Sequence, residues 1–156
     1  MDNNFLAFDA HAAILRDLAF SYLKVDFNQG LDARLVTDLN AFWLAKIKWI
    51  RFIRFSCDTP EMREKVRDAV ALVRQHGYSG EVFCYVLVRD IGEAHETVKF
   101  LMSIGVDPFA QAFADYTEGR TRTVEQQRFC NWCNKAPVRK TTPWENYQST
   151  FRRKRK

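Results

Sequence analysis

Three features are scarce in this chain of 156 residues, and each limits the classes of protein to which the chain can belong. No apolar run approaches the ~20 residues that a membrane-spanning helix needs, so we expect no membrane association. No secretory leader is recognisable and only four cysteines are present, so we expect a cytoplasmic, reducing compartment in which the thiols stay unpaired. Charge of one sign is also scarce, since the net charge is only +5.

The small positive charge is concentrated at the carboxyl end. Residues 152–156 are all Arg or Lys, and without them the chain is close to neutral. The basic balance therefore indicates nucleic-acid binding only weakly, through nonspecific contacts between this tail and phosphates. A solvated, disordered terminus explains the same residues, and we treat 151–156 as a basic disordered tail.

The body of the chain alternates apolar strands with amphipathic helices. The strands begin about every 25–30 residues, which is the size of a strand-plus-helix unit. This repetition predicts an α/β fold of repeating β/α units with right-handed crossovers, either an open sheet or a partial (β/α) barrel, an incomplete TIM-like barrel. We assign 1–115 to this core and 116–150 to a C-terminal aromatic-rich extension that packs on it.

Hydrophobic periodicity and cap residues predict the individual elements. The expected strands are 5–7, 25–34, 52–57, 82–88 and 109–114. The expected helices are 9–24, 37–47, 59–77, 90–105 and a short one at 144–150.

One expected strand carries polar side chains where a parallel sheet is normally apolar. Because side chains alternate along a strand, Asn28, Asp32 and Arg34 would share one face. Burying such groups without partners is costly, so this face should line a site. A solvated inner layer of an incomplete barrel, with no ligand, is the alternative.

The next strand repeats the pattern, with Arg54, Ser56 and Asp58 alternating along it. In β/α folds the chemistry lies at the carboxyl ends of the strands, so the two polar sets should meet there. Amide, hydroxyl, carboxylate and guanidinium groups suit the ribose, amino and carboxylate groups of a polar cofactor. A buried structural Arg–Asp network is the alternative.

These segments resemble, in order and spacing, the later strands of the radical S-adenosylmethionine enzymes, which have a partial (β/α) barrel. The segments that carry the resemblance are Asp2-Asn3-Asn4-Phe5, Phe27-Asn28-Gln29-Gly30-Leu31-Asp32-Ala33-Arg34, Arg54-Phe55-Ser56-Cys57-Asp58, Tyr85-Val86-Leu87, Arg128-Phe129-Cys130-Asn131-Trp132 and Pro143-Trp144-Glu145-Asn146-Tyr147. The resemblance implies binding of S-adenosylmethionine, with cofactor-facing roles for Asn28, Asp32, Arg34, Arg54 and Asp58.

The chain departs from that family at the iron–sulfur motif. The family binds a four-iron four-sulfur cluster through Cys-x-x-x-Cys-x-x-Cys after its first strand, and no cysteines here have that spacing. The family's first two strands also have no counterpart. The resemblance therefore implies a fragment that is inactive alone or completed by a missing N-terminal part. A noncatalytic nucleic-acid- or protein-binding module on the same fold is the alternative, and whether the chain is an enzyme stays open.

Cys130 and Cys133 form a Cys-x-x-Cys pair in what we expect to be a late loop. A zinc site needs four ligands, and neither the other two cysteines nor the three histidines have metal-ligand spacing to this pair. We interpret the pair as two incidental thiols near a buried Trp. The histidines are interpreted as helix-surface residues.

A barrel without its first strands would leave the edge of a strand at 2–6 unpaired. Unpaired edges and apolar patches promote association, and thirteen phenylalanines are many for a small domain to bury. We expect the chain to form a homodimer, to aggregate, or to need a polypeptide that supplies the missing β/α units. Alternatively, the C-terminal aromatic segment folds across the open edge.

We predict that the isolated chain carries no stable iron–sulfur cluster, because three correctly spaced thiolates are needed and only one close pair exists. Anaerobic reconstitution with iron and sulfide, followed by a visible absorption spectrum, tests this. A stoichiometric absorbance typical of a four-iron centre would contradict it.

Overall fold

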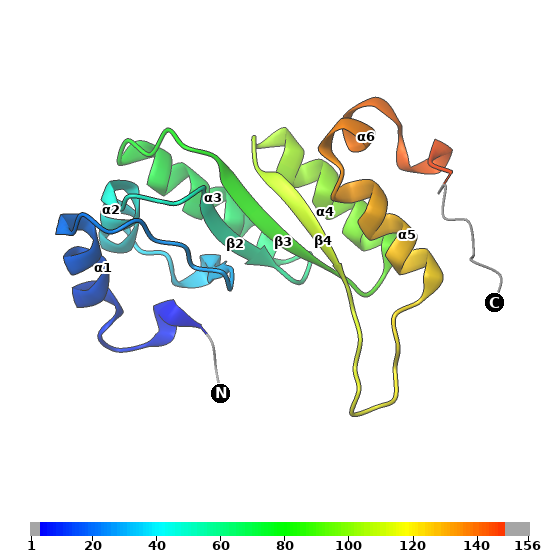
Figure 1. The fold of residues 1–156 in the computed structure, drawn as a ribbon, viewed down its shortest axis with the longest axis horizontal. Coiled ribbons are helices and arrows are strands. Elements are labelled where there is room, and N and C mark those ends of the chain that lie inside the picture. Colours follow the sequence, from blue (N-terminus) through cyan, green and yellow to red (C-terminus); the bar gives the residue numbers. More distant parts are fainter. Residues whose placement is uncertain (1–3, 149–156) are drawn as a thin grey trace.

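The computed structural model describes residues 4–148, in which four parallel strands form one sheet in the order β1-β2-β3-β4 (Figure 1). The strands are β1 (Leu31–Asp32), β2 (Ile53–Cys57), β3 (Val82–Val88) and β4 (Asp107–Ala112). The α-helices are α1 (His11–Phe20), α2 (Asp38–Lys46), α3 (Met62–Gln75), α4 (Ile91–Ser103), α5 (Val124–Cys133) and α6 (Ala136–Thr141). Three 3₁₀ helices are η1 (Phe5–Ala7), η2 (Ala33–Leu35) and η3 (Trp144–Asn146). The expected α/β fold of β/α units is confirmed.

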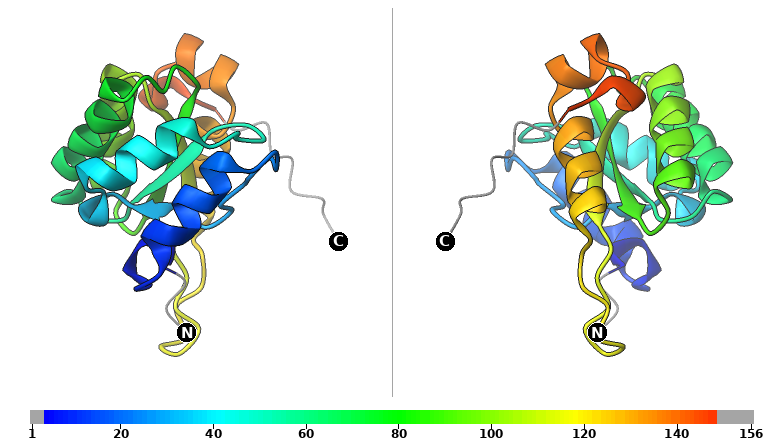
Figure 2. Two further views of the ribbon diagram at one scale, coloured as in Figure 1. Left: turned by 90° about the vertical axis from the view of Figure 1, so that its left-hand side faces the viewer. Right: turned by 90° about the vertical axis from the view of Figure 1, so that its right-hand side faces the viewer.

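The sheet is covered by helices on one face only. Helices α3 and α4 lie together on one side of the strands, and no helix in the described part of the chain lies over the other side (Figures 1 and 2). Along β3 the burial alternates: Val82, Cys84, Val86 and Val88 are buried, whereas the residues between them are only half-buried. One face of β3 therefore belongs to the core, and the other faces an open side of the sheet.

The predicted stops of α3 and α4 and the predicted cap of α4 are confirmed, whereas α3 begins at Met62, later than the expected start at 59. Asp90 caps α4 with a carboxylate that accepts a hydrogen bond from the Glu93 N–H. Each helix ends before a glycine with positive φ, Gly77 at 91° and Gly105 at 71°, a conformation that costs other residues strain. Thr37 caps α2 in the same way as Asp90 caps α4, through the Asn40 N–H.

The expected strand at 5–7 is wrong, since these residues form the 3₁₀ helix η1. In this turn Leu6 is buried while the Phe5 ring stacks on Phe27, with the ring centroids 4.6 Å apart. A strand would have sent these two neighbouring side chains to opposite faces. Residues 2 and 3 of the expected edge strand lie outside the described residues.

The expected strand at 25–34 is also shorter than predicted. Only Leu31 and Asp32 pair with β2, preceded by an isolated parallel bridge between Val25 and Trp49. The chain turns into η2 directly after Asp32, because the Asp32 carboxylate accepts a hydrogen bond from the Arg34 N–H and so caps that turn. Asn28, Asp32 and Arg34 therefore do not share the face of one regular strand.

Gly30 is required where this segment passes β2. A Cβ atom at this position would lie 2.7 Å from the Phe55 carbonyl oxygen, which is a backbone atom that cannot move aside easily. The close approach brings residues 28–32 against the sheet.

The Cys130–Cys133 pair lies in a helix, not in the expected loop. Thr123 and Gln126 form a capping box that begins α5, and both thiols are buried on it. The capping signal Thr-x-x-Gln is present in the sequence, although the expected helices above do not include this one. Burial raises the pKa of the Cys133 thiol to about 12, which makes it unreactive at neutral pH.

The C-terminal aromatic residues pack against α4 and α5. Trp132 and Trp144 lie with their ring centroids 5.8 Å apart, and both contact Phe129. His95 of α4 packs edge-on against Phe129 and Trp132, so it is half-buried rather than on the helix surface as expected. Desolvation lowers the pKa of His95.

Helix α5 also closes the outer edge of β4. The Asn134 side chain accepts a hydrogen bond from the Ala110 N–H (2.7 Å) and donates one to the Ala110 carbonyl oxygen (2.9 Å). The amide thus replaces a neighbouring strand at this edge. No helix among residues 4–148 is long and apolar enough to cross a bilayer.

We predict that Asn134→Ala lowers the free energy of unfolding by about 1–3 kcal/mol, because it leaves two β4 backbone groups without partners. Asn131→Ala is the matched control on the same helix, since the Asn131 side chain makes no hydrogen bond within residues 4–148. Urea unfolding followed by far-ultraviolet circular dichroism measures both. Equal losses in the two variants would contradict the role of Asn134.

Candidate functional site

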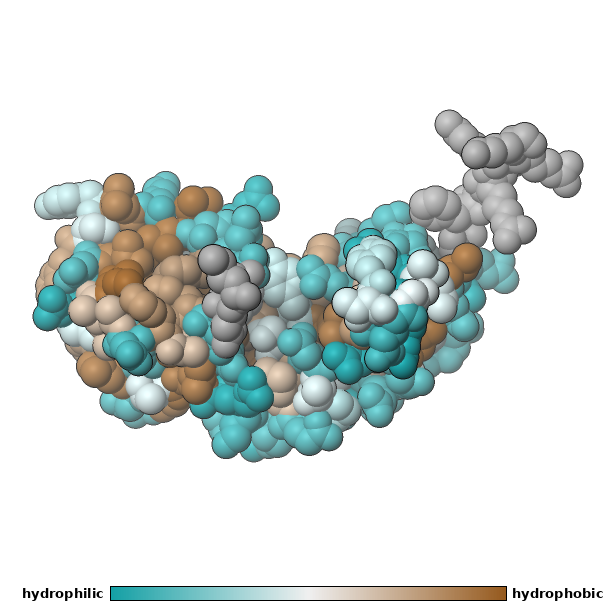
Figure 3. All heavy atoms as spheres, turned by 90° about the horizontal axis from the view of Figure 1, so that it is seen from below, coloured by the Kyte–Doolittle hydropathy of each residue, from teal (hydrophilic) through white to brown (hydrophobic). Residues whose placement is uncertain are grey.

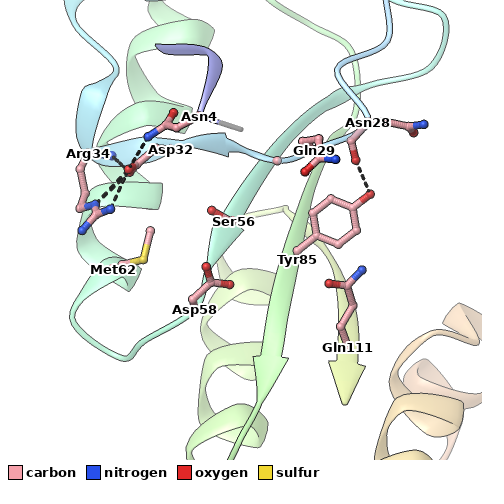
Figure 4. A pocket seen from close by; sticks show the side chains of 11 residues that line it. Asn4, Asn28, Gln29, Asp32, Arg34, Ser56, Asp58, Met62, Tyr85 and Gln111 are labelled. Atoms are coloured by element: carbon pink, nitrogen blue, oxygen red, sulfur yellow. Dashed lines mark hydrogen bonds and ion pairs between the residues drawn. The ribbon is translucent and has the colours of Figure 1, made fainter. Parts of the chain in front are cut away.

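A polar pocket of about 470 Å³ lies at the carboxyl ends of β1 and β2, on the open side of the sheet (Figure 4). Figure 3, seen from below the view of Figure 1, shows a hollow between two raised parts of the surface, with apolar side chains gathered on one of them. The pocket is lined by Asn4, Asn28, Gln29, Gly30, Asp32, Arg34, Ser56, Asp58, Met62, Tyr85 and Gln111.

Asp32 is the best-anchored group of this pocket. Its carboxylate accepts hydrogen bonds from the Asn4 side chain (3.1 Å) and from the Arg34 guanidinium, whose Nη2 atom lies 2.7 Å from Oδ2 (Figure 4). The Asp32 side chain is 10% exposed, whereas that of Arg34 is 62% exposed. The hydrogen bond from Arg34 lowers the pKa of Asp32, so this carboxylate is ionised at neutral pH.

Asp58 follows β2 and also lines the pocket, but its environment is the opposite. Burial raises the pKa of Asp58, and the positive charge of Arg89 only partly offsets this. The pKa values of the two carboxylates of the pocket are therefore shifted in opposite directions, which is a common arrangement at functional sites.

The floor of the pocket comes from β3 and β4. The Tyr85 hydroxyl donates a hydrogen bond to the Asn28 carbonyl oxygen (3.0 Å), which holds residues 28–30 above the sheet. Gln111 of β4 projects into the same space (Figure 4). Behind Tyr85 the face is aromatic, since its ring contacts Phe109 and Phe83.

The structure brings four of the five expected site residues together and leaves one out. Asn28, Asp32, Arg34 and Asp58 line the pocket, although the Asn28 contact shown by the hydrogen bonds is made by its backbone. Arg54 does not line the pocket. Its guanidinium forms an ion pair with Asp26 and stacks over the Phe52 ring. The position of Arg54 therefore fits the alternative of a buried structural Arg–Asp network better than a cofactor-facing role.

Sequence reasoning did not place Tyr85 and Gln111 in the site. Gln111 interrupts the otherwise apolar run Pro108-Phe109-Ala110-Gln111-Ala112, and a polar residue in such a run was a usable signal. Tyr85 had no such signal, because a Tyr in a strand is ordinary.

The described residues do not provide a cluster or metal site. Cys57 and Cys84 are buried in β2 and β3, and the other two cysteines lie on α5. Within 4–148 no three His, Cys, Asp or Glu side chains gather as metal ligands would. The four described cysteines therefore do not fit a four-iron cluster.

Comparison of the chain with protein-family models and with curated proteins finds no match.

We predict opposite effects of neutralising the two carboxylates. At pH 7, Asp32→Asn lowers the free energy of unfolding by about 1–3 kcal/mol, because it leaves the Arg34 and Asn4 donors poorly paired. Asp58→Asn raises it only slightly, because partial burial raises the pKa of Asp58 but solvent at this exposed residue screens most of the cost of ionising it.

The pH dependence has a definite sign for each residue. The stabilisation from Asp32 is present above the unfolded pKa of an aspartate, about 3.9, and is lost as pH falls through its lower folded pKa. The cost at Asp58 is present above its raised folded pKa and disappears as pH falls below the unfolded pKa. Urea unfolding of both variants at pH 7 and pH 3.5 tests this, and shifts of equal sign at pH 7 would contradict it.

Proposed function

We propose that this chain is the carboxyl-terminal part of a radical S-adenosylmethionine-type partial (β/α) barrel and that its polar pocket binds the adenosyl part of S-adenosylmethionine. The observation that carries the proposal is the position of the pocket. Polar groups from neighbouring parallel strands converge at the carboxyl ends on a sheet face that none of the described helices covers. That is where β/α folds bind their ligands.

The donor and acceptor groups of the pocket suit a nucleoside. Asp58 offers carboxylate oxygens to ribose hydroxyl groups, and Ser56 offers a hydroxyl beside it. Asp32, whose oxygens accept from Arg34 and Asn4, holds the Arg34 guanidinium at the pocket. The Gln111 amide offers a donor and an acceptor to the edge of a planar base. The volume of about 470 Å³ lies in the usual range for small-molecule sites.

Radical chemistry needs a partner for this chain. In the proposed family the cluster supplies the electron that cleaves the bound S-adenosylmethionine, and the described residues offer no cluster ligands. Binding and orienting the adenosyl group is therefore the proposed role of this polypeptide, with a complementing N-terminal polypeptide supplying the rest.

The two edges of the sheet differ in how they admit such a polypeptide. Asn134 and α5 close the edge at β4, whereas β1 is a two-residue strand flanked by η1. A homodimer that joined β1 of one copy to β4 of another would have to displace α5. Addition on the β1 side is the arrangement that this fold favours.

The test is binding of S-adenosylmethionine, which we predict raises the melting temperature weakly, because a ligand that binds only the native state stabilises it. The ligand-induced shift should be absent in Asp32→Ala, which removes the anchored carboxylate. Asp68→Ala is the control, because Asp68 lies exposed on α3 outside the pocket. Differential scanning fluorimetry with millimolar ligand, each variant compared with its own ligand-free curve, measures the shift. No shift in the unmodified chain, or a shift that survives in Asp32→Ala, would contradict the proposal.

A further inference from the structure

A second cavity of about 560 Å³ adjoins the polar pocket on the side of β4. It lies between β4, the length of α5 from Gln127 to its C-cap Asn134, and the projecting hairpin formed by residues 113–122, which Figure 1 shows extending beyond the carboxyl end of the sheet. Gln111 lines both cavities, so they are neighbours. The residues that line the second cavity include Phe109, Gln111, Phe113, Tyr116, Arg122 and Gln127.

Arg122 gives this cavity an uncompensated positive charge. Its side chain is exposed and forms no ion pair with any carboxylate among residues 4–148. Arg120 on the same hairpin is different, because it pairs with Glu118 and does not line the cavity. A free guanidinium at the edge of a cavity is suited to a carboxylate or phosphate.

Aromatic rings flank this charge. Tyr116 is 76% exposed, and Phe109 is half-buried beneath the cavity. A second guanidinium, that of Arg89, stacks on Phe113 at 4.5 Å from the ring centroid. A planar ligand would find a stacking surface here beside a cation.

The hairpin is held in place by its own hydrogen bonds. The Asp115 carboxylate accepts from the Thr117 N–H (3.0 Å) and hydroxyl (2.6 Å), and the backbones of Asp115 and Arg120 pair in both directions. Tyr116 lies within this turn, and Arg122 follows it two residues after Arg120.

The amides of the cavity differ in availability. Both hydrogen-bonding groups of the Asn134 side chain are used by Ala110. The side chains of Gln111 and Gln127 make no hydrogen bond within residues 4–148 and remain able to bind a ligand.

We propose that this cavity binds a planar ring that carries an anionic group, with the anion on Arg122 and the ring against Tyr116 and Phe109. The ligand's role rests on the proposed function: if the polar pocket binds the adenosyl group, this ligand is the second substrate. It would lie beside the adenosyl group, on the other side of Gln111. The anion is a carboxylate or a phosphate, and the chemistry of Arg122 accepts both.

Two-dimensional ¹H–¹⁵N NMR titrations of the full chain with phenyl phosphate, benzoate and uncharged benzamide test the site. At least one anion should shift the signals of Ala112, Ala114 and the Gln127 side-chain amide with millimolar affinity, and benzamide should bind about tenfold more weakly, as the loss of one charge-assisted hydrogen bond implies. Binding of one anion and not the other identifies the anionic group.

Arg122→Gln should weaken the binding of the preferred anion by about tenfold. Arg120→Gln, on the same hairpin, should leave it unchanged. Equal binding of benzamide, unchanged binding in Arg122→Gln, or no shifts with either anion would overturn the site. The change in melting temperature caused by S-adenosylmethionine is expected to depend on Asp32 and not on Arg122. The two experiments can therefore contradict the anion site and the proposed function independently of each other.

Discussion

Helices α3 and α4 bury one face of the parallel sheet, and the other face has to be stabilised without a packed layer. The aromatic residues of that face meet this requirement by packing on one another. Phe83 stacks on Phe52 with ring centroids 4.8 Å apart and contacts Phe109 at 5.5 Å. Each ring is thus half-buried even though residues 4–148 supply no second layer over this face.

The polar pocket depends on the same open face. With no helix of residues 4–148 above it, Asp32 keeps its charge through Arg34, whose own side chain reaches solvent, while Asp58 stays exposed and its pKa is raised only by partial burial. A covering layer would have made both carboxylates costly to bury. An open face therefore permits a polar site beside an aromatic floor, and it supports both the adenosyl-binding proposal and the neighbouring anion site.

Most of the fold was predictable from local signals. The strand at 82–88 and the helices begun by Thr37 and Asp90 follow directly from apolar runs and cap residues, because these depend on a few adjacent positions. The errors lie where local patterns compete with distant contacts. η1 forms where the Phe5 ring stacks on Phe27, some twenty residues further along the chain. The segment at 25–34 bends because the Asp32 carboxylate caps η2. Whether the sheet closes further into a barrel remains part of the proposal.

By itself, the sequence determined the repeating β/α units and most of the polar groups at the carboxyl ends of the first strands, since periodicity and strand direction are local properties. Only the tertiary structure decided which of these groups meet. Asp32 and Asp58 converge with Tyr85 and Gln111, while Arg54 turns to Asp26, because partners are chosen by proximity in space and by the need to pair a buried charge. The same reason separates Arg122, which forms no ion pair within residues 4–148, from Arg120, which pairs with Glu118.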